Sequence, residues 1–114
     1  MSRLSKEDIL NASDIDYVEV AVPEWGGIVR VSTITGQAKD KLEMALSGKN
    51  SSLDNVRARI IALCVVDDND ALMFSDADVV KLGKKSAKAL ERVFQAAQKL
   101  NAIGDAEVES LAKN

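Results

Sequence analysis

The acidic run Asp67-Asp68-Asn69-Asp70 comes nearer to a metal site than any other segment of the sequence. A calcium-binding loop places oxygen ligands at alternating positions, a glycine at the sixth position and a glutamate at the twelfth. Counted from Asp67, the sixth position is Leu72 and the twelfth is Asp78, so the pattern is broken. We therefore interpret the run as a turn whose carboxylates accept hydrogen bonds from backbone amides, and we predict no metal site.

Cys64 is the only cysteine and the other candidate for chemistry, because a thiolate is a strong nucleophile. Activation of a thiol needs a neighbouring base, and the sequence contains no histidine to supply one. Cys64 also falls on the apolar stripe of a predicted helix, which is typical of a small buried hydrophobic side chain. We predict no catalytic residue.

A phosphate-binding loop is suggested by Gly83-Lys84-Lys85-Ser86, which joins a glycine to basic and hydroxyl side chains. The upstream glycine of such a loop is missing, however, and no GxGxxG spacing occurs in the sequence. The segment fits a helix boundary followed by a basic turn. Serines at 51, 52, 75 and 86 precede helical runs, where capping explains them. We therefore predict that the chain is not an enzyme and takes no cofactor.

Length and composition fit a single domain over 1–114. The 114 residues are 46% hydrophobic and 29% charged, which allows a buried core without disulfides or metals. The formal charge of −3 argues against a nucleic-acid partner. No apolar run reaches the ~20 residues that span a bilayer, and the first residues do not resemble a secretory signal. We expect a soluble cytoplasmic protein with no membrane partner.

The first third of the chain predicts a short helix and a β-hairpin. Within an N-terminal segment, 1–16, Ser5 and Asp8 have the spacing of a capping box. Apolar residues then alternate with others from 17 to 34, on both sides of a Pro/Gly turn at 23–27, which predicts an antiparallel hairpin. An isolated hairpin is marginally stable, so its valine face must cover either the helices of this chain or another subunit.

Helical periodicity dominates the remaining region, 35–114, and the whole predicts an α+β, mainly α fold: a hairpin followed by about four helices. We predict helices over 36–47, 53–66, 75–83 and 84–101, with Gly104 as the residue that terminates the last of them. A further short helix would start at Asp105 and carry Val108 and Leu111. The helix over 53–66 is apolar on more than one side, so we place it at the centre of the core.

Two apolar segments outside the helices are candidates for partner binding or self-association. Trp25 lies at the predicted hairpin tip, where burial within the monomer or against a neighbour is favoured. Leu72, Met73 and Phe74 form an apolar connection after the acidic run. If these segments mediate self-association, exchange of Trp25 or Phe74 for alanine should shift sedimentation toward monomer. Charges are also segregated, with an acidic stretch over 67–78 and a basic one over 84–99, which suits either docking or solvated helix faces.

The segment 22–31, Val-Pro-Glu-Trp-Gly-Gly-Ile-Val-Arg-Val, resembles the opening of the tail assembly chaperones of long-tailed bacteriophages. Blocks over 59–67 and 72–79 follow in the order typical of that family. The closing pattern is Leu90-Glu91-Arg92-Val93-Phe94 with Leu100-Asn101. The resemblance spans about 17 to 111, nearly the whole chain.

The resemblance implies a non-enzymatic role in a long-tailed, siphovirus-type phage or prophage. Members of the family bind the tape measure protein, keep it soluble, help to recruit tail tube subunits, and are absent from the mature virion. They assemble into homo-oligomers in the host cytoplasm. In many phages a ribosomal frameshift adds a C-terminal extension that contacts the tail tube protein, and this chain resembles the shorter form. The family implies no catalytic residue.

Two other functions fit the same residues. A structural tail or head–tail component retained in the virion would have a similar composition, and mass spectrometry of purified particles separates it from a chaperone. A bacterial adaptor could use the basic face over 84–99 on nucleic acid, and its binding would weaken steeply with salt.

Overall fold

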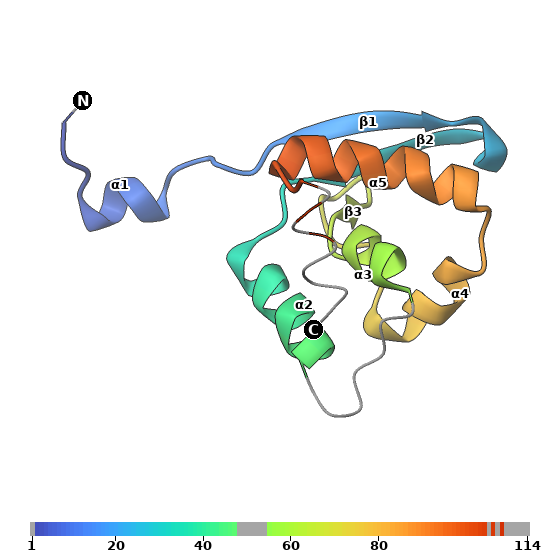
Figure 1. Ribbon diagram of the computed structural model, residues 1–114. Coiled ribbons are helices and arrows are strands. Elements are labelled where there is room, and N and C mark those ends of the chain that lie inside the picture. The colour runs from blue at the N-terminus through green and yellow to red at the C-terminus, as the bar shows by residue number, and fades with distance from the viewer. Residues whose placement is uncertain (1, 48–54, 105, 107, 109–114) are drawn as a thin grey trace.

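The computed structural model describes residues 2–47, 55–104, 106 and 108 (Figure 1). This part of the chain contains three strands, five α-helices and two short 3-10 helices. Their order is α1 (Lys6–Leu10), β1 (Tyr17–Val22), η1 (Pro23–Trp25), β2 (Gly27–Ser32), α2 (Gly36–Ser47), α3 (Val56–Ala62), β3 (Val65–Val66), η2 (Asp76–Asp78), α4 (Val79–Gly83) and α5 (Ala87–Asn101). The predicted α+β, mainly α fold class is confirmed.

The predicted hairpin is present, and β1 pairs with β2 in antiparallel register from Tyr17↔Ser32 to Val22↔Gly27. The connection is η1, with Pro23 as its first residue, where the missing amide hydrogen costs nothing. Gly26 closes it with φ at 75°, a left-handed conformation that a residue without Cβ adopts readily. Local chemistry therefore accounts for the hairpin.

The helix predicted over 53–66 is wrong in its last four residues, 63–66. Residues 53 and 54, with the capping serines at 51 and 52, lie outside the described residues, and α3 ends at Ala62. Val65 and Val66 instead form β3, which pairs with the inner edge of the hairpin through Val65↔Val31 and Val66↔Arg30. A continuous apolar run carries no periodicity, so it fits a buried strand as well as a buried helix.

The core lies between the sheet, α3 and α5. In Figure 1, α5 runs along the hairpin and covers one of its faces, while α3 packs beneath α5. Side chains with no exposed surface come from each layer: Val22, Val31, Ile60, Cys64, Ala89, Val93 and Ala97. The prediction that the region around Ile60 forms the centre of the core is confirmed, and the valine face of the hairpin is covered by the chain's own helices.

Helix α5 begins three residues later than the predicted start at Lys84. Ser86 caps it, accepting a hydrogen bond from the Ala89 amide at 3.3 Å. It ends at Asn101 as predicted, but the residue in the left-handed position at its end is Ala102, with φ at 54°, and not Gly104. The amide of Ile103 then donates to the Gln98 carbonyl at 2.9 Å, a bond typical of helix ends.

The other predicted helices are confirmed within the described residues. Thr35 caps α2 by accepting from the Ala38 amide at 3.1 Å. Ser75 and Asp78 form the predicted capping box ahead of α4, which ends at Gly83. The start and the Leu111 side of the last predicted helix lie outside the described residues, although Val108 packs half-buried against the core.

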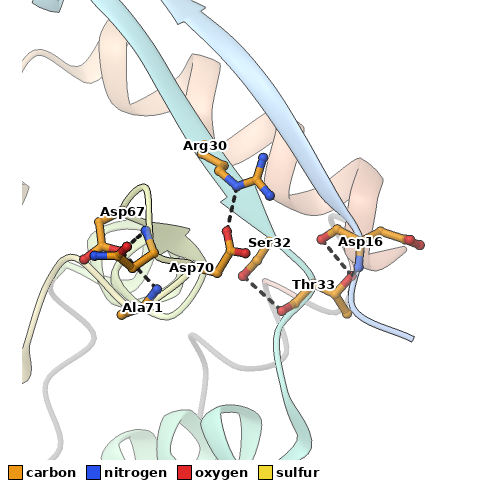
Figure 2. Close-up of polar contacts among 8 residues, drawn as sticks. Asp16, Arg30, Ser32, Thr33, Asp67, Asp70 and Ala71 are labelled. Atoms are coloured by element: carbon orange, nitrogen blue, oxygen red, sulfur yellow. Dashed lines mark hydrogen bonds and ion pairs between the residues drawn. The ribbon is translucent and has the colours of Figure 1, made fainter. Parts of the chain in front are cut away.

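The N-terminal arm, which we define as residues 2–14, stands apart from the rest of the molecule in Figure 1. It contains α1, whose capping box is present as predicted: the Asp8 amide donates to the Ser5 hydroxyl, and the Ser5 amide to the Asp8 carboxylate. All of its residues are exposed. At the base of the arm, Asp16 and Thr33 exchange hydrogen bonds beside the hairpin (Figure 2).

Candidate partner-binding surfaces

The acidic run forms a turn that uses its carboxylates internally (Figure 2). One oxygen of Asp67 accepts from the amides of Asn69 at 2.8 Å and Ala71 at 3.1 Å. Asp70 has φ at 62° and binds the Arg30 guanidinium at 2.9 Å. The predicted role of the run, to satisfy backbone amides, is therefore confirmed for Asp67, and Asp70 anchors the turn to β2. Within the described residues, no cluster of acidic or cysteine side chains could hold a metal ion.

Cys64 is fully buried where α3 gives way to β3. Burial raises the pKa of its thiol to about 12, because the apolar surroundings disfavour the thiolate. The thiol lies 3.3 Å from the Ile60 carbonyl oxygen, the partner of a weak S–H donor. These contacts support the interpretation of Cys64 as a core residue.

A groove of about 610 Å³ lies between α2, α3 and the connection that carries Leu72 and Phe74. We call it the α2–α3 groove. Its apolar lining is contributed mainly by Leu42, Ala62, Leu63, Leu72, Phe74 and Val79. Leu72 is held there by backbone pairing with Val66, and the next amide, of Met73, donates to the Val65 carbonyl at 3.0 Å. Strand β3 thus positions the apolar connection as one wall of the groove.

Three charged side chains lie among the groove residues: Lys41 from α2, Arg59 from α3 and Asp76 from η2. The Nε atom of Arg59 is buried, and it has no hydrogen-bond partner among the residues that the structure describes. A buried donor without an acceptor is costly, by about 1–3 kcal/mol. The groove therefore combines apolar walls with two cationic side chains and one anionic side chain.

The hairpin tip forms a second, separate surface. Trp25 is 38% exposed, so its ring is neither in the core nor fully in solvent. The neighbouring Glu24 binds the Arg92 guanidinium of α5 at 2.9 Å, which fixes the tip against that helix. The pKa of the Glu24 carboxyl is lowered mainly by a hydrogen bond from the backbone of Glu24 itself, and to a lesser extent by Arg92. Ile28, 67% exposed, lies on the adjacent strand.

The four candidate residues from the sequence therefore fall on different surfaces. Leu72 and Phe74 come together in the α2–α3 groove, whereas Trp25 belongs to the hairpin tip. Met73 is exposed but is not among the groove residues. The roles of Arg59 and of α2 could not be predicted from the sequence, because packing decides which helix faces meet. The exposed apolar residues of the arm had a signal in the sequence, since Leu4, Ile9 and Leu10 are large side chains on a helix too short to form a core.

The comparisons with known proteins bear on the fold. No family model matches the sequence, and no curated protein sequence matches it. Within the described residues, none of the helices combines the length and apolar character needed to cross a bilayer. Among solved structures, that of the bacteriophage HK97 tail assembly chaperone is similar, with a TM-score of 0.62 over 87% of this chain and 95% of that chain, at 19% identity. The chain thus has the fold of a phage tail assembly chaperone, as the order of its sequence motifs indicated.

Proposed function

We propose that this chain is a phage tail assembly chaperone that binds the tape measure protein and keeps it soluble while the tail is built. The observation that carries the proposal is the shared fold, which extends over 87% of the chain and coincides with the resemblance of its sequence motifs. Such a protein acts through binding surfaces and needs no reaction centre. The internal bonding of the acidic run and the raised pKa of Cys64 agree with a binding role.

The α2–α3 groove is the surface that we assign to the tape measure protein. An amphipathic helix binds by laying its apolar face in a hydrophobic groove, with residues at helical spacing as anchors. The groove offers apolar walls from Leu72 and Phe74, and the cationic side chains of Lys41 and Arg59 lie among its lining residues. Covering the apolar face of a helix in this way would prevent it from aggregating.

Further elements of the proposal follow from the family resemblance. The chain would self-associate, act in the host cytoplasm, and be absent from the mature virion. Contact with the tail tube protein would depend on a longer, frameshifted form. A chaperone is favoured over a component of the particle by the fold comparison, since the similar structure is that of an assembly chaperone.

Co-expression with the tape measure protein encoded beside it tests the proposal. We expect soluble tape measure protein only when this chain is present, and recovery of the two as a complex. Phe74→Glu should abolish the complex by placing a charge in the groove, whereas Val80→Glu, on the exposed side of α4, should leave it intact. Soluble tape measure protein in the absence of the chain, or stoichiometric amounts of the chain in purified particles, would contradict the proposal.

A further inference from the structure

The N-terminal arm presents three large apolar side chains that its own chain does not cover. Leu4, Ile9 and Leu10 are 67%, 57% and 72% exposed, and no residue of α1 is buried. Scattered single apolar residues are common on protein surfaces, but three within seven positions on an otherwise unattached segment form a patch. A patch of this kind is typical of a segment that binds elsewhere.

The arm is nevertheless organised for binding. Its helix has a complete capping box, and Leu4 and Ile9 occupy the two positions of a hydrophobic staple, directly before the cap and at the fourth helical residue. Helices much shorter than ~12 residues are marginal in water when isolated. Local interactions therefore favour a conformation that would be fully stable only against a partner.

We infer that the arm of one copy docks in the α2–α3 groove of a second copy. The groove supplies what the arm lacks, an apolar cover, with walls that include Leu72 and Phe74. The arm in turn supplies what the groove lacks. Asp8 is engaged by Ser5, but the carboxylate of Glu7 has no hydrogen bond or ion pair within the described residues and is available to a cationic side chain of the groove.

The charges and spacing of the two surfaces agree with this pairing. Glu7 and Leu10 are three residues apart and so lie on one side of α1. Insertion of Leu10 between the apolar walls would therefore turn the Glu7 carboxylate toward the groove as well. Of the charged side chains in the groove, Lys41 and Arg59 are cationic and Asp76 is anionic, a net charge of +1. The arm carries Arg3 and Lys6 against Glu7, Asp8 and Asp14, a net charge of −1, which is of the opposite sign.

A second copy is the occupant indicated by the course of the chain. The arm leaves the body at Asp16, where hydrogen bonds with Thr33 anchor it beside the hairpin. From there it extends away from its own body, with every residue from 2 to 14 exposed (Figure 1). Arm and groove are different surfaces, so each copy can give one arm and receive another, and successive contacts build an oligomer.

This inference deepens the self-association that is part of the proposed function, and it adds a consequence for partner binding. The arm of a neighbour would cover the groove while no tape measure protein is present, and an incoming helix would displace it. Groove substitutions should then impair both self-association and tape measure binding, whereas arm substitutions should impair self-association alone.

Disulfide formation between two differently substituted chains tests the contact directly. We would mix full-length Leu10→Cys protein with full-length Ala77→Cys protein, since Ala77 is an exposed residue of the groove, and oxidise the mixture mildly. Covalent heterodimer should form, because the arm of one chain brings its thiol to the groove of the other. Cys64 is fully buried and does not compete.

Ile28→Cys in place of Ala77→Cys is the matched control, since Ile28 is exposed and lies on the hairpin, outside the groove. We expect at least about tenfold less heterodimer with this control. Equal yields of heterodimer with the two variants would overturn the inference. A separate chain that carries both Leu10→Cys and Ala77→Cys should form its disulfide between copies, and a disulfide formed only within the monomer would also overturn the inference. The experiment contains no tape measure protein, so its failure is distinct from failure of the proposed function.

Sedimentation of the full-length chain gives an independent measurement. Exchange of Leu4, Ile9 and Leu10 for serine should weaken self-association by about 100-fold, as expected for loss of interface anchors, without changing monomer stability. Glu7→Gln should weaken it by about 10-fold through loss of a charge-assisted hydrogen bond. Ile28→Ser removes an equally exposed apolar side chain from the hairpin and should have no effect. An oligomer distribution that responds to Ile28→Ser but not to the arm variants would overturn the inference.

Discussion

The N-terminal arm and the packed body of this protein follow the same local rules and end in opposite situations. Each begins a helical segment with a serine and an aspartate three residues later, Ser5 with Asp8 in the arm and Ser75 with Asp78 in the body. Each carries large aliphatic side chains. In the body these side chains are removed from water by the sheet, α3 and α5, whereas in the arm they remain exposed.

The difference shows that capping determines where a helix begins but not whether it contributes to stability. The isoleucine of the arm, Ile9, is 57% exposed, while Ile60 of α3 is fully buried. Burial of a side chain of this size stabilises a fold by about 1.5–3 kcal/mol. The body therefore already gains this stabilisation from burial, whereas the arm would gain it only by binding to a second chain.

The largest contrast between the two regions should be seen in thiol reactivity. Because burial raises the pKa of Cys64 from 9.0 to about 12, its thiolate is roughly 1000-fold scarcer than that of an ordinary cysteine at neutral pH. A Leu10→Cys variant of the arm, examined at a concentration where the chain is monomeric, should react at the rate of a model thiol. Labelling with a chromogenic disulfide reagent measures both rates. Comparable reactivity of the two thiols in the folded protein would remove the distinction between body and arm.

Truncation of one isoleucine in each region should have the next largest effect. Ile60→Ala leaves a cavity in the core and should lower the free energy of unfolding by about 3 kcal/mol. The matched variant Ile9→Ala removes the same atoms from an exposed position and should change it by less than about 0.5 kcal/mol. Urea denaturation of dilute protein measures both changes, and a large loss for Ile9→Ala would show that the arm packs on its own body.

The two capping aspartates should give the smallest but most selective contrast, as a function of pH. Hydrogen bonds from the backbone amide of the capping serine, and then from its hydroxyl, hold the pKa of Asp8 and of Asp78 below the ordinary value of 3.8. A carboxyl whose pKa is lowered by folding stabilises the folded state above its unfolded pKa. That contribution is lost as the pH falls through the folded pKa.

Asp78→Asn should therefore reduce global stability above about pH 4, and the difference from the unsubstituted protein should vanish in stronger acid. Asp8→Asn should leave global stability unchanged at every pH and abolish only the local helical signal of the arm. Denaturation series at several pH values, together with NMR titration of the two carboxyls, measure these effects. Equal effects of the two substitutions on global unfolding would show that arm and body unfold as one unit.

Much of the fold could be predicted from local patterns. The alternating valines around Pro23 predicted the hairpin, and serine or threonine caps predicted the start of α1, α2 and α4. These signals are local because a cap or a tight turn depends on a few neighbouring residues. The turn at Asp67 was interpreted correctly for the same reason, since its hydrogen bonds reach only two and four residues ahead.

The errors arose where residues distant in sequence decide the outcome. The apolar run from Ile60 to Val66 has no period, and pairing of Val65 with Val31 of β2 is what ends the helix and makes β3. Ala102 takes a left-handed conformation without the help of glycine. The side chain of the preceding Asn101 accepts from the Ile34 amide at 2.7 Å, which joins the end of α5 to the segment before α2.

The candidate site shows the same division. Residue types alone indicated a protein that works by binding, because histidine is absent, the lone cysteine lies on an apolar stripe, and the acidic run does not fit a metal loop. They also indicated Leu72 and Phe74 as apolar residues outside the helices and therefore as candidates for partner binding or self-association. That these two face Arg59 and α2 across a groove, while Trp25 lies on another surface and the arm stands free, was decided by packing. Hydrophobic periodicity predicts which residues tend to be buried, but only the packing of elements distant in sequence determines which apolar side chains remain exposed.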